Sequence, residues 1–219
     1  MIVIGLGPRA AGALLCALLT GGCALLTKQE PLAPRYFSAE PSEQTSPQPN
    51  PPADGAGSPR DLKLGRVTSA SYLGERLVFR DSEYELGFYD DRRWTEKPED
   101  YFRRALSRAL FEQGAFRRVV SGGGPTLECE LVELAELRAP AHVARARVHF
   151  ILFDARSVRT EATVTVDLPI AAGKSAAEAP ASVAALARAL SSVVVQIVDR
   201  VSTNLEVTPA SPGTAGSRP

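Results

Sequence analysis

The sequence predicts one α+β domain, in which two main helices pack on one face of a mostly antiparallel sheet. Segments in which apolar and polar residues alternate surround two segments with helical spacing, in the order strands, helix, strands, helix. The short connection 155–157 joins two long alternating segments, which is typical of an antiparallel hairpin. Once the tethers at both ends are set aside, roughly 150 residues remain, enough to bury one core.

An apolar segment near the start of the chain, Ala10–Leu19, predicts export from the cytoplasm. It follows the basic Arg9 and is too short to span a bilayer, which takes about 20 apolar residues. Two small glycines precede Cys23, so the stretch resembles a bacterial lipoprotein signal. We therefore expect a signal peptide at residues 1–22 and a lipid attached to Cys23. The alternative is an ordinary cleaved signal that leaves Cys23 unmodified.

The residues around the anchor predict how the mature chain is organised. Ala24 follows the cysteine, as in Gram-negative lipoproteins of the outer membrane, which face the periplasm. Residues 23–59 are predicted to form a lipidated tether, with a candidate first strand at 35–39 and a linker rich in proline, serine and glycine. The domain follows at 60–208, and 209–219 form a disordered tail.

The composition excludes nucleic acid as a partner and a disulfide framework for the fold. Lysine plus arginine and aspartate plus glutamate number 25 each, so the chain lacks the concentrated basic charge that nucleic acid binding requires. Cys16 leaves with the signal peptide and Cys23 carries the lipid. Only Cys129 then remains as a thiol, so no intrachain disulfide forms in the mature protein.

The first half of the domain is predicted to contain three strands and a helix. Alternation over 62–67, 77–80 and 84–89 predicts the strands, and Asp81-Ser82 suits a turn between the last two. The helix is expected to begin after Thr95, a predicted N-cap. Its apolar stripe consists of Phe102, Ala105, Leu106, Ala109 and Leu110.

The second half is predicted to contain four strands and a long helix. A brief strand at 116–120 precedes a longer one at 126–137, in which the alternation slips at Val132–Leu134, as a β-bulge would cause. Residues 144–168 form the long hairpin. The last helix, at 181–205, is apolar over more than one stripe, so we expect it to pack across the sheet.

One face of the predicted hairpin is polar and is expected to contact solvent. Ile151 and Phe153 interrupt this pattern. They are interpreted as an exposed apolar contact for a partner or as residues that a loop covers. The polar positions are Arg145, Arg147, Glu161, Thr163, Thr165 and Asp167.

Residues that usually carry chemistry are sparse, and we expect no catalytic, cofactor-binding or metal site. The chain has two histidines, His142 and His149, and neither has a second ligand residue at the usual spacing. Cys129 has no histidine partner and is interpreted as a small buried hydrophobe. No nucleophile elbow or zinc-protease motif occurs. Scattered residues can still assemble an active site, so a periplasmic hydrolase is the least favoured alternative.

The stretch Tyr72–Trp94, YLGERLVFRDSEYELGFYDDRRW, carries a family resemblance. Its matching features are Tyr72-Leu73, the strand that ends at Arg80, and Arg93-Trp94 leading into the predicted helix. Tyr36-Phe37 is similar to the family's opening strand. With these features the chain resembles the ABC-type transport auxiliary lipoproteins, which include the paraquat-inducible protein C-like lipoproteins. Tyr72, Arg80 and Trp94 are therefore candidate family-signature or partner-contact residues.

The resemblance implies a non-enzymatic component that works with an ABC permease, its ATPase and an MCE-domain periplasmic protein to move lipids between membranes. Such a protein docks or organises the complex at the outer membrane, and self-association into a homo-oligomer is also implied. The alternative function is an envelope lipoprotein that regulates or scaffolds cell-wall synthesis or secretion machinery.

Two of the candidate residues also have structural explanations in the sequence. Trp94, immediately before a helix, is expected to pack into the core, because buried aromatic side chains usually serve packing. Arg80 is expected to pair with Glu83, Glu85 or a turn carbonyl.

Overall fold

The computed structural model describes residues 33–40, 59–113, 116–171 and 178–206. The chain divides after Ala33 into two units, and every element described below belongs to the second. The predicted signal peptide, Cys23, the proline-rich linker at 41–58 and the tail at 209–219 lie outside the described residues.

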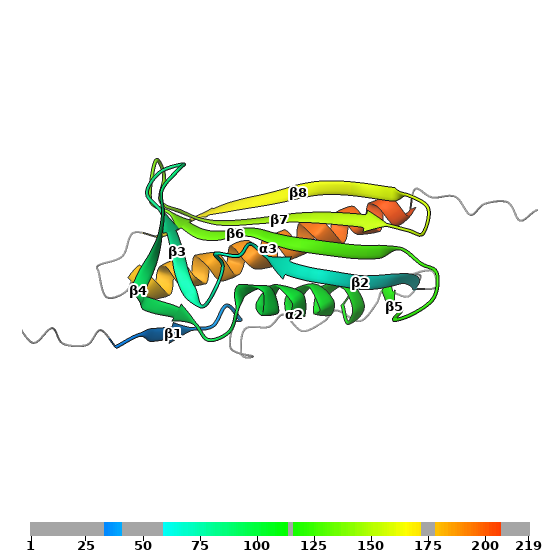
Figure 1. Cartoon of the computed structure of the whole chain (residues 1–219), viewed down its shortest axis with the longest axis horizontal. Coiled ribbons are helices and arrows are strands. Elements are labelled where there is room, and N and C mark those ends of the chain that lie inside the picture. The colour runs from blue at the N-terminus through cyan, green and yellow to red at the C-terminus, as the bar shows by residue number, and fades with distance from the viewer. Residues whose placement is uncertain (1–32, 41–58, 114–115, 172–177, 207–219) are drawn as a thin grey trace, which may run out of the picture. The chain divides into compact units, whose positions relative to one another are not determined.

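The long strand β6 (Thr126–Leu137) is the centre of an eight-stranded sheet. On one side it pairs with β7 (Val143–Phe153), which pairs in turn with β8 (Val158–Pro169), both antiparallel. On its other side β6 pairs first with β2 (Arg60–Ser69) and then with β3 (Arg76–Arg80), and both pairings are parallel. Figure 1 shows β2 and β3 following one another along β6.

Three further strands complete the sheet beyond β2 and β3. β4 (Leu86–Trp94) pairs antiparallel with β3, and β1 (Arg35–Phe37) pairs parallel with β4 at the sheet edge. β5 (Phe116–Arg118) pairs parallel with the start of β2. The β3–β4 hairpin has the predicted turn, but β4 begins at Leu86, so Tyr84 lies at the tip and is 91% exposed.

The expectation of a mostly antiparallel sheet is wrong, because four of the seven strand pairs are parallel. The strands 62–67 and 77–80 do not pair with each other. Each pairs parallel with a different part of β6, and the chain leaves the sheet between Ser69 and Arg76. After β2 and β3 the chain forms β4 and a helix before it reaches β6. Parallel pairing requires a long connection of this kind.

The β-bulge predicted in the central strand is present. The register between β6 and β7 shifts between Leu131 and Glu133. After the shift the side chains of β6 change face, so that Glu136 lies opposite Ala144 on the side covered by helices. The long hairpin of β7 and β8 also matches its prediction, with antiparallel pairing along both strands.

Two helices cover the same face of the sheet, as predicted (Figure 1). α2 (Pro98–Phe111) contacts β2, β5 and β6, and its buried stripe includes Phe102, Leu106 and Leu110. Thr95 is not the N-cap: Lys97 takes that position without a side-chain bond, and Pro98 begins the helix. The hydroxyl of Thr95 instead contacts that of Tyr101.

The second helix, α3 (Glu178–Glu206), lies across β6, β7 and β8 and also contacts α2. By length and composition, Ala179–Glu206 is apolar enough to cross a membrane. Half of its most apolar window is buried inside the protein, and Ala185, Ala189 and Ile197 are fully enclosed. These properties are those of a core helix that packs on a sheet.

Candidate interaction surface

The face of the sheet that the helices leave uncovered is the candidate interaction surface, here named the open face. Side chains on β7 alternate strictly, so that Ala146 and Val148 are buried toward the helices while Arg147 and His149 point the other way. The polar positions expected to contact solvent all lie on the open face. Its members on the four longest strands include Arg66, Thr68, Glu128, Glu130, Arg145, Arg147, His149, Ile151, Glu161, Thr163, Thr165 and Asp167.

Cross-strand ion pairs tie β7 and β8 together on this face. Arg145 donates two hydrogen bonds to Asp167, from Nε at 2.7 Å and from the terminal nitrogen at 2.6 Å. The hydrogen bonds from Arg145 hold the pKa of the Asp167 carboxyl below its ordinary value. Both side chains are partly exposed, so the pair contributes little to stability and mainly fixes the positions of the charges.

The bulge in β6 carries the most enclosed charge on the open face. Glu133 is 4% exposed, and its carboxylate accepts a 2.7 Å hydrogen bond from Arg80 Nε. Arg147 approaches the other oxygen of Glu133 at 3.5 Å. Tyr72 lies beside this group and donates its hydroxyl to the carbonyl of Val132 at 2.8 Å. Burial, followed by the charge of Glu133, raises the pKa of Tyr72.

Two of the three candidate residues therefore converge on this bulge, and the third does not. Arg80 also donates to the carbonyl of Glu83 at 3.3 Å, which is the predicted turn contact, although Glu133 is its closer partner. Trp94 is 2% exposed, and its ring meets that of Tyr101 edge to face in the core. Cys23 lies outside the described residues.

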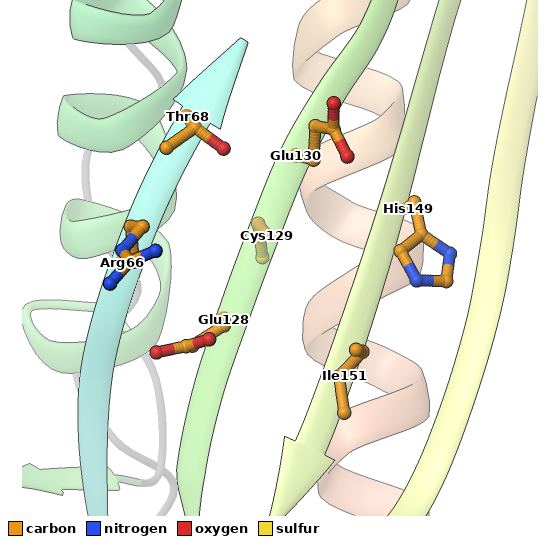
Figure 2. Close-up of a pocket in the computed structure, with 7 residues that line it drawn as sticks. All are labelled: Arg66, Thr68, Glu128, Cys129, Glu130, His149 and Ile151. Atoms are coloured by element: carbon orange, nitrogen blue, oxygen red, sulfur yellow. The ribbon is translucent and has the colours of Figure 1, made fainter. Parts of the chain in front are cut away.

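Two hollows mark the open face. Figure 2 shows the first, of about 180 Å³, which is lined by Arg66 on β2, by Glu128 and Glu130 on β6 and by His149 on β7. The second, of about 360 Å³, extends from Tyr72 to Arg76 and Phe88, and the Arg76 guanidinium lies 5.2 Å from the Phe88 ring. Both are shallow compared with the enclosed pockets that hold small ligands. Surfaces of this kind suit a macromolecular partner.

Ile151 lines the first hollow and is half-buried, as is Phe153 at the end of the same strand. Cys129 also borders this hollow, but its side chain is 4% exposed and faces the core. Burial raises the pKa of the Cys129 thiol to about 12, which keeps it protonated.

One arrangement near the first hollow has the order of a hydrolytic triad. His149 lies between Glu161, at 3.3 Å from Nε2, and Thr163, at 3.4 Å from Nδ1. These contacts are long, and Glu161 is more than half exposed. Activation of a hydroxyl needs a short hydrogen bond in a site that excludes water, and this position offers neither. Among the described residues, no group of three or more histidine, cysteine or acidic side chains is placed to hold a metal ion.

A second buried carboxylate lies on the helix side, and no pattern in the sequence predicted it. Glu136 is 4% exposed and is bonded to His142 Nε2 at 2.6 Å and to the Tyr89 hydroxyl at 2.9 Å. Burial acts to raise the pKa of Glu136, but hydrogen bonds from His142, Tyr89 and Ser182 outweigh it and lower the pKa. The shift at the bulge turns Glu136 inward, so strict alternation would have misplaced it.

Arg92 also belongs to this helix-side cluster, but its hydrogen bonding is incomplete. Its guanidinium lies 3.9 Å from the Tyr89 ring centre and 3.9 Å from Glu136. Within the described part of the chain, Arg92 Nε is the one buried side-chain nitrogen or oxygen without a hydrogen-bond partner. The cluster as a whole is polar and closed by α3, and it supports the fold from inside.

Solved structures share this architecture at low sequence identity. Protein XCC0632 from Xanthomonas campestris superposes with a TM-score of 0.63 at 20% identity, over 78% of this chain and 97% of that one. An uncharacterized protein gives 0.56 at 13% identity, over 77% and 99%. The hypothetical protein CT253 from Chlamydia trachomatis gives 0.49 at 11% identity, over 68% and 99%. The first two show that the fold is shared.

Among curated proteins none matches the sequence. A family model does match, over residues 42–198, and its description is "ABC-type transport auxiliary lipoprotein component". The matched range contains every strand of the sheet except β1, both residues that converge on the bulge, and most of α3. The chain therefore belongs to the ABC-type transport auxiliary lipoprotein component family.

Proposed function

We propose that this protein is a non-enzymatic, lipid-anchored auxiliary component of an ABC-type lipid transport system linked to an MCE-domain protein. It docks or organises the periplasmic part of that complex at the outer membrane. The observation that supports this most is the family match over 42–198 in a chain that begins with a lipoprotein-like signal. A partner-binding role also suits an open face with two shallow hollows and no short nucleophile–base contact.

In this proposal the signal peptide, 1–22, is removed and Cys23 carries the acyl chains. Because β1 belongs to the sheet, only residues 23–34 separate the proposed lipid from the first strand. Such a segment reaches at most about 40 Å when fully extended. The domain is thereby confined near the membrane, where its open face meets the permease complex or the MCE-domain protein.

Recovery of partners from detergent-solubilised envelopes tests the transport role. With the full acylated chain as bait, we expect to recover an ABC permease, its ATPase and an MCE-domain protein. Recovery of peptidoglycan synthases or secretion components without an MCE-domain protein would overturn the proposal and favour the alternative scaffold function.

A charge reversal on the open face tests where the partner binds. Arg66 is exposed beside the first hollow, so Arg66→Glu should lower partner recovery at least several-fold (Figure 2). Arg188→Glu is the matched control, because Arg188 is exposed on α3, in the layer opposite the open face. Equal recovery with both variants would place the partner elsewhere.

The anchor has a separate test. Cys23→Ala should leave a precursor that incorporates no labelled palmitate and does not float with outer-membrane vesicles, since two or more acyl chains are what hold such a protein firmly. Unchanged labelling would contradict the assignment of Cys23 as the attachment site.

A further inference from the structure

The second hollow on the open face lies next to the strand that receives the tether. Tyr36 of β1 is in register with Arg93 of β4, one of the residues that line this hollow. Because Trp94 is buried in the core and neighbouring residues of a strand point to opposite faces, Arg93 and Tyr36 both lie on the open face. Figure 1 shows β1, β3 and β4 together at one end of the sheet. The proposed lipid on Cys23 is therefore joined by a short tether to a strand beside this hollow.

One of the two arginines in this hollow is fully engaged within the protein. Arg76 donates a 2.6 Å hydrogen bond to the carboxylate of Asp90. It also donates to the backbone carbonyls of Phe88 and Tyr89, at 3.3 Å each. Its guanidinium lies 5.2 Å from the centre of the Phe88 ring. Arg76 and Phe88 therefore form a fixed wall of the hollow, and the charge of Arg76 is already balanced.

Two other charged side chains of the hollow, Arg93 and Glu75, have no such partner. They carry opposite charges, yet among the described residues neither side chain makes a hydrogen bond or an ion pair, with the other or with a third residue. Arg93 also lies directly opposite Arg76 in the β3–β4 pairing. Like charges in that position are destabilising, so a negative group bound beside Arg93 would stabilise the pair. A ligand that carries both charges can satisfy Arg93 and Glu75 together.

A phosphoethanolamine headgroup matches this arrangement. Its phosphate accepts paired hydrogen bonds from a guanidinium, and its ammonium donates to a carboxylate. The hollow has a volume of about 360 Å³ and is shallow, so it can take a headgroup whose acyl chains stay in the bilayer. Tyr36 beside it is 60% exposed, and tyrosine is typical of the interface between membrane and water.

We propose that this hollow docks on the membrane surface, where Arg93 binds the phosphate and Glu75 binds the ammonium of a phosphoethanolamine-type headgroup. The length of the chain favours a membrane over a free solute, because only residues 23–34 separate the proposed lipid from β1. A tether this short holds headgroups near the hollow at a high effective concentration. The inference rests on the proposed function only for the lipid anchor, and it does not involve the first hollow.

The distance of the hollow from headgroups can be measured with the full acylated chain in vesicles. The vesicles contain equal parts of phosphatidylethanolamine and phosphatidylglycerol, with a small share of lipid that carries a nitroxide on its headgroup. A fluorophore on Tyr36→Cys, beside the hollow, should be quenched several-fold more than one on Gln196→Cys. Gln196 is the matched control, because it is exposed on α3, in the layer opposite the open face. Cys129 does not interfere, because it is buried.

Two results of this measurement overturn the proposal. Equal quenching at the two positions would mean that the domain does not rest on the membrane by this end of the open face. An absence of quenching at Tyr36→Cys would leave the hollow to a protein partner or to another part of the chain.

Two variants that remove single charges test which groups bind. Arg93→Gln and Glu75→Gln should each reduce the quenching at Tyr36→Cys to the level of the α3 control, with unchanged circular dichroism. Glu75 is exposed ahead of β3, so its variant tests the site even where Arg93→Gln lowers stability. Arg156→Gln, at an exposed position between β7 and β8, removes the same charge as Arg93→Gln and should have no effect. A folded Arg93→Gln or Glu75→Gln variant that keeps full quenching overturns the proposal.

Vesicles of phosphatidylglycerol alone distinguish a zwitterion site from a general anion site. Phosphatidylglycerol has the phosphate but no ammonium, so quenching at Tyr36→Cys should fall several-fold and should no longer depend on Glu75. Equal quenching in both kinds of vesicle overturns the assignment of the headgroup. A chain that does not float with the vesicles overturns the anchor and this proposal together. A chain that floats without quenching overturns this proposal alone, and recovery of transport partners is measured separately.

Discussion

At the residue scale, Glu133 is the side chain on which the open face depends most. It is almost fully buried, and its charge is balanced by Arg80 and more distantly by Arg147. Removing one partner of a buried ion pair leaves the other charges uncompensated. We expect Glu133→Ala to lower the free energy of unfolding by about 2 to 3 kcal/mol, measured by urea titration.

The same strand supplies a control for that measurement. Glu130 lies on the same face but is exposed, and no ion pair with another described residue holds it. Glu130→Ala should change the free energy of unfolding by less than about 0.5 kcal/mol. If the two variants lose equal stability, the burial of Glu133 is not what makes it important.

Cys129 illustrates how burial sets reactivity. With its pKa raised to about 12 by burial, the thiol is far less ionised at pH 8 than an ordinary cysteine, and only the thiolate reacts. We expect iodoacetamide to modify native Cys129 about a thousandfold more slowly than a thiol of ordinary pKa. Mass spectrometry of the mature chain, with and without urea, checks this. Rapid labelling without urea would show that the core opens around β6.

At the scale of elements, the β3–β4 hairpin depends on a close approach at Gly87. A Cβ at this position would lie 2.3 Å from Phe79 Cζ. The ring cannot move away easily, because the Arg138 guanidinium lies 3.6 Å from its centre and the Tyr89 ring packs against it at 5.0 Å. Gly87→Ala should therefore destabilise the domain by about 1 to 3 kcal/mol in thermal or urea unfolding.

A second substitution separates this clash from a general backbone effect. Phe79→Leu removes the ring, so the double variant should be more stable than the sum of the two single changes predicts. Gly124→Ala is the control, because no heavy atom lies within 4 Å of its added Cβ. Strict additivity of Gly87→Ala and Phe79→Leu would mean that the two residues do not interact.

The elements also show what the sequence could and could not predict. Local alternation was enough for the existence of each long strand, for the β7–β8 hairpin and for the bulge at Glu133, since these depend on neighbours in the chain. The strand predicted at 84–89 was placed too early, because β4 begins at Leu86 and Tyr84 is exposed at the hairpin tip. The partners of β2 and β3 depend on contacts with β6, far along the sequence, and no local pattern records them. The inward turn of Glu136 was missed for a related reason, because it requires the register shift to be placed to the residue.

At the scale of the whole molecule, the candidate residues of the resemblance separate into two roles. Tyr72 and Arg80 are distant from Glu133 in the sequence. The parallel pairing of β3 with β6 brings them close to Glu133 at the bulge in β6. Trp94 instead closes the core where β4 leads into α2. The continuous stretch Tyr72–Trp94 therefore supplies residues to both faces of the sheet, the open face and the face covered by helices.

The response of the whole domain to acid follows from Glu136. Its pKa in the folded state is lowered below the ordinary 4.5, so the native protein binds fewer protons there than the unfolded chain. The resulting stability is fully present above about pH 4.5 and is lost as the pH falls through the folded-state pKa. The carboxyls of Asp61, Asp154 and Asp167 also have lowered pKa values and contribute in the same direction.

Glu136→Gln removes one titrating group while keeping the shape of the side chain. The variant should be less stable than the unmodified protein near neutral pH, because the hydrogen bonds from His142 and Tyr89 lose a charged acceptor. The gap between the two should narrow as the pH falls below about 4.5, since only the unmodified protein loses the contribution of Glu136 there. Urea midpoints measured from about pH 3 to pH 7 give both curves. A constant gap across that range would mean that the helix-side cluster does not depend on the charge of Glu136.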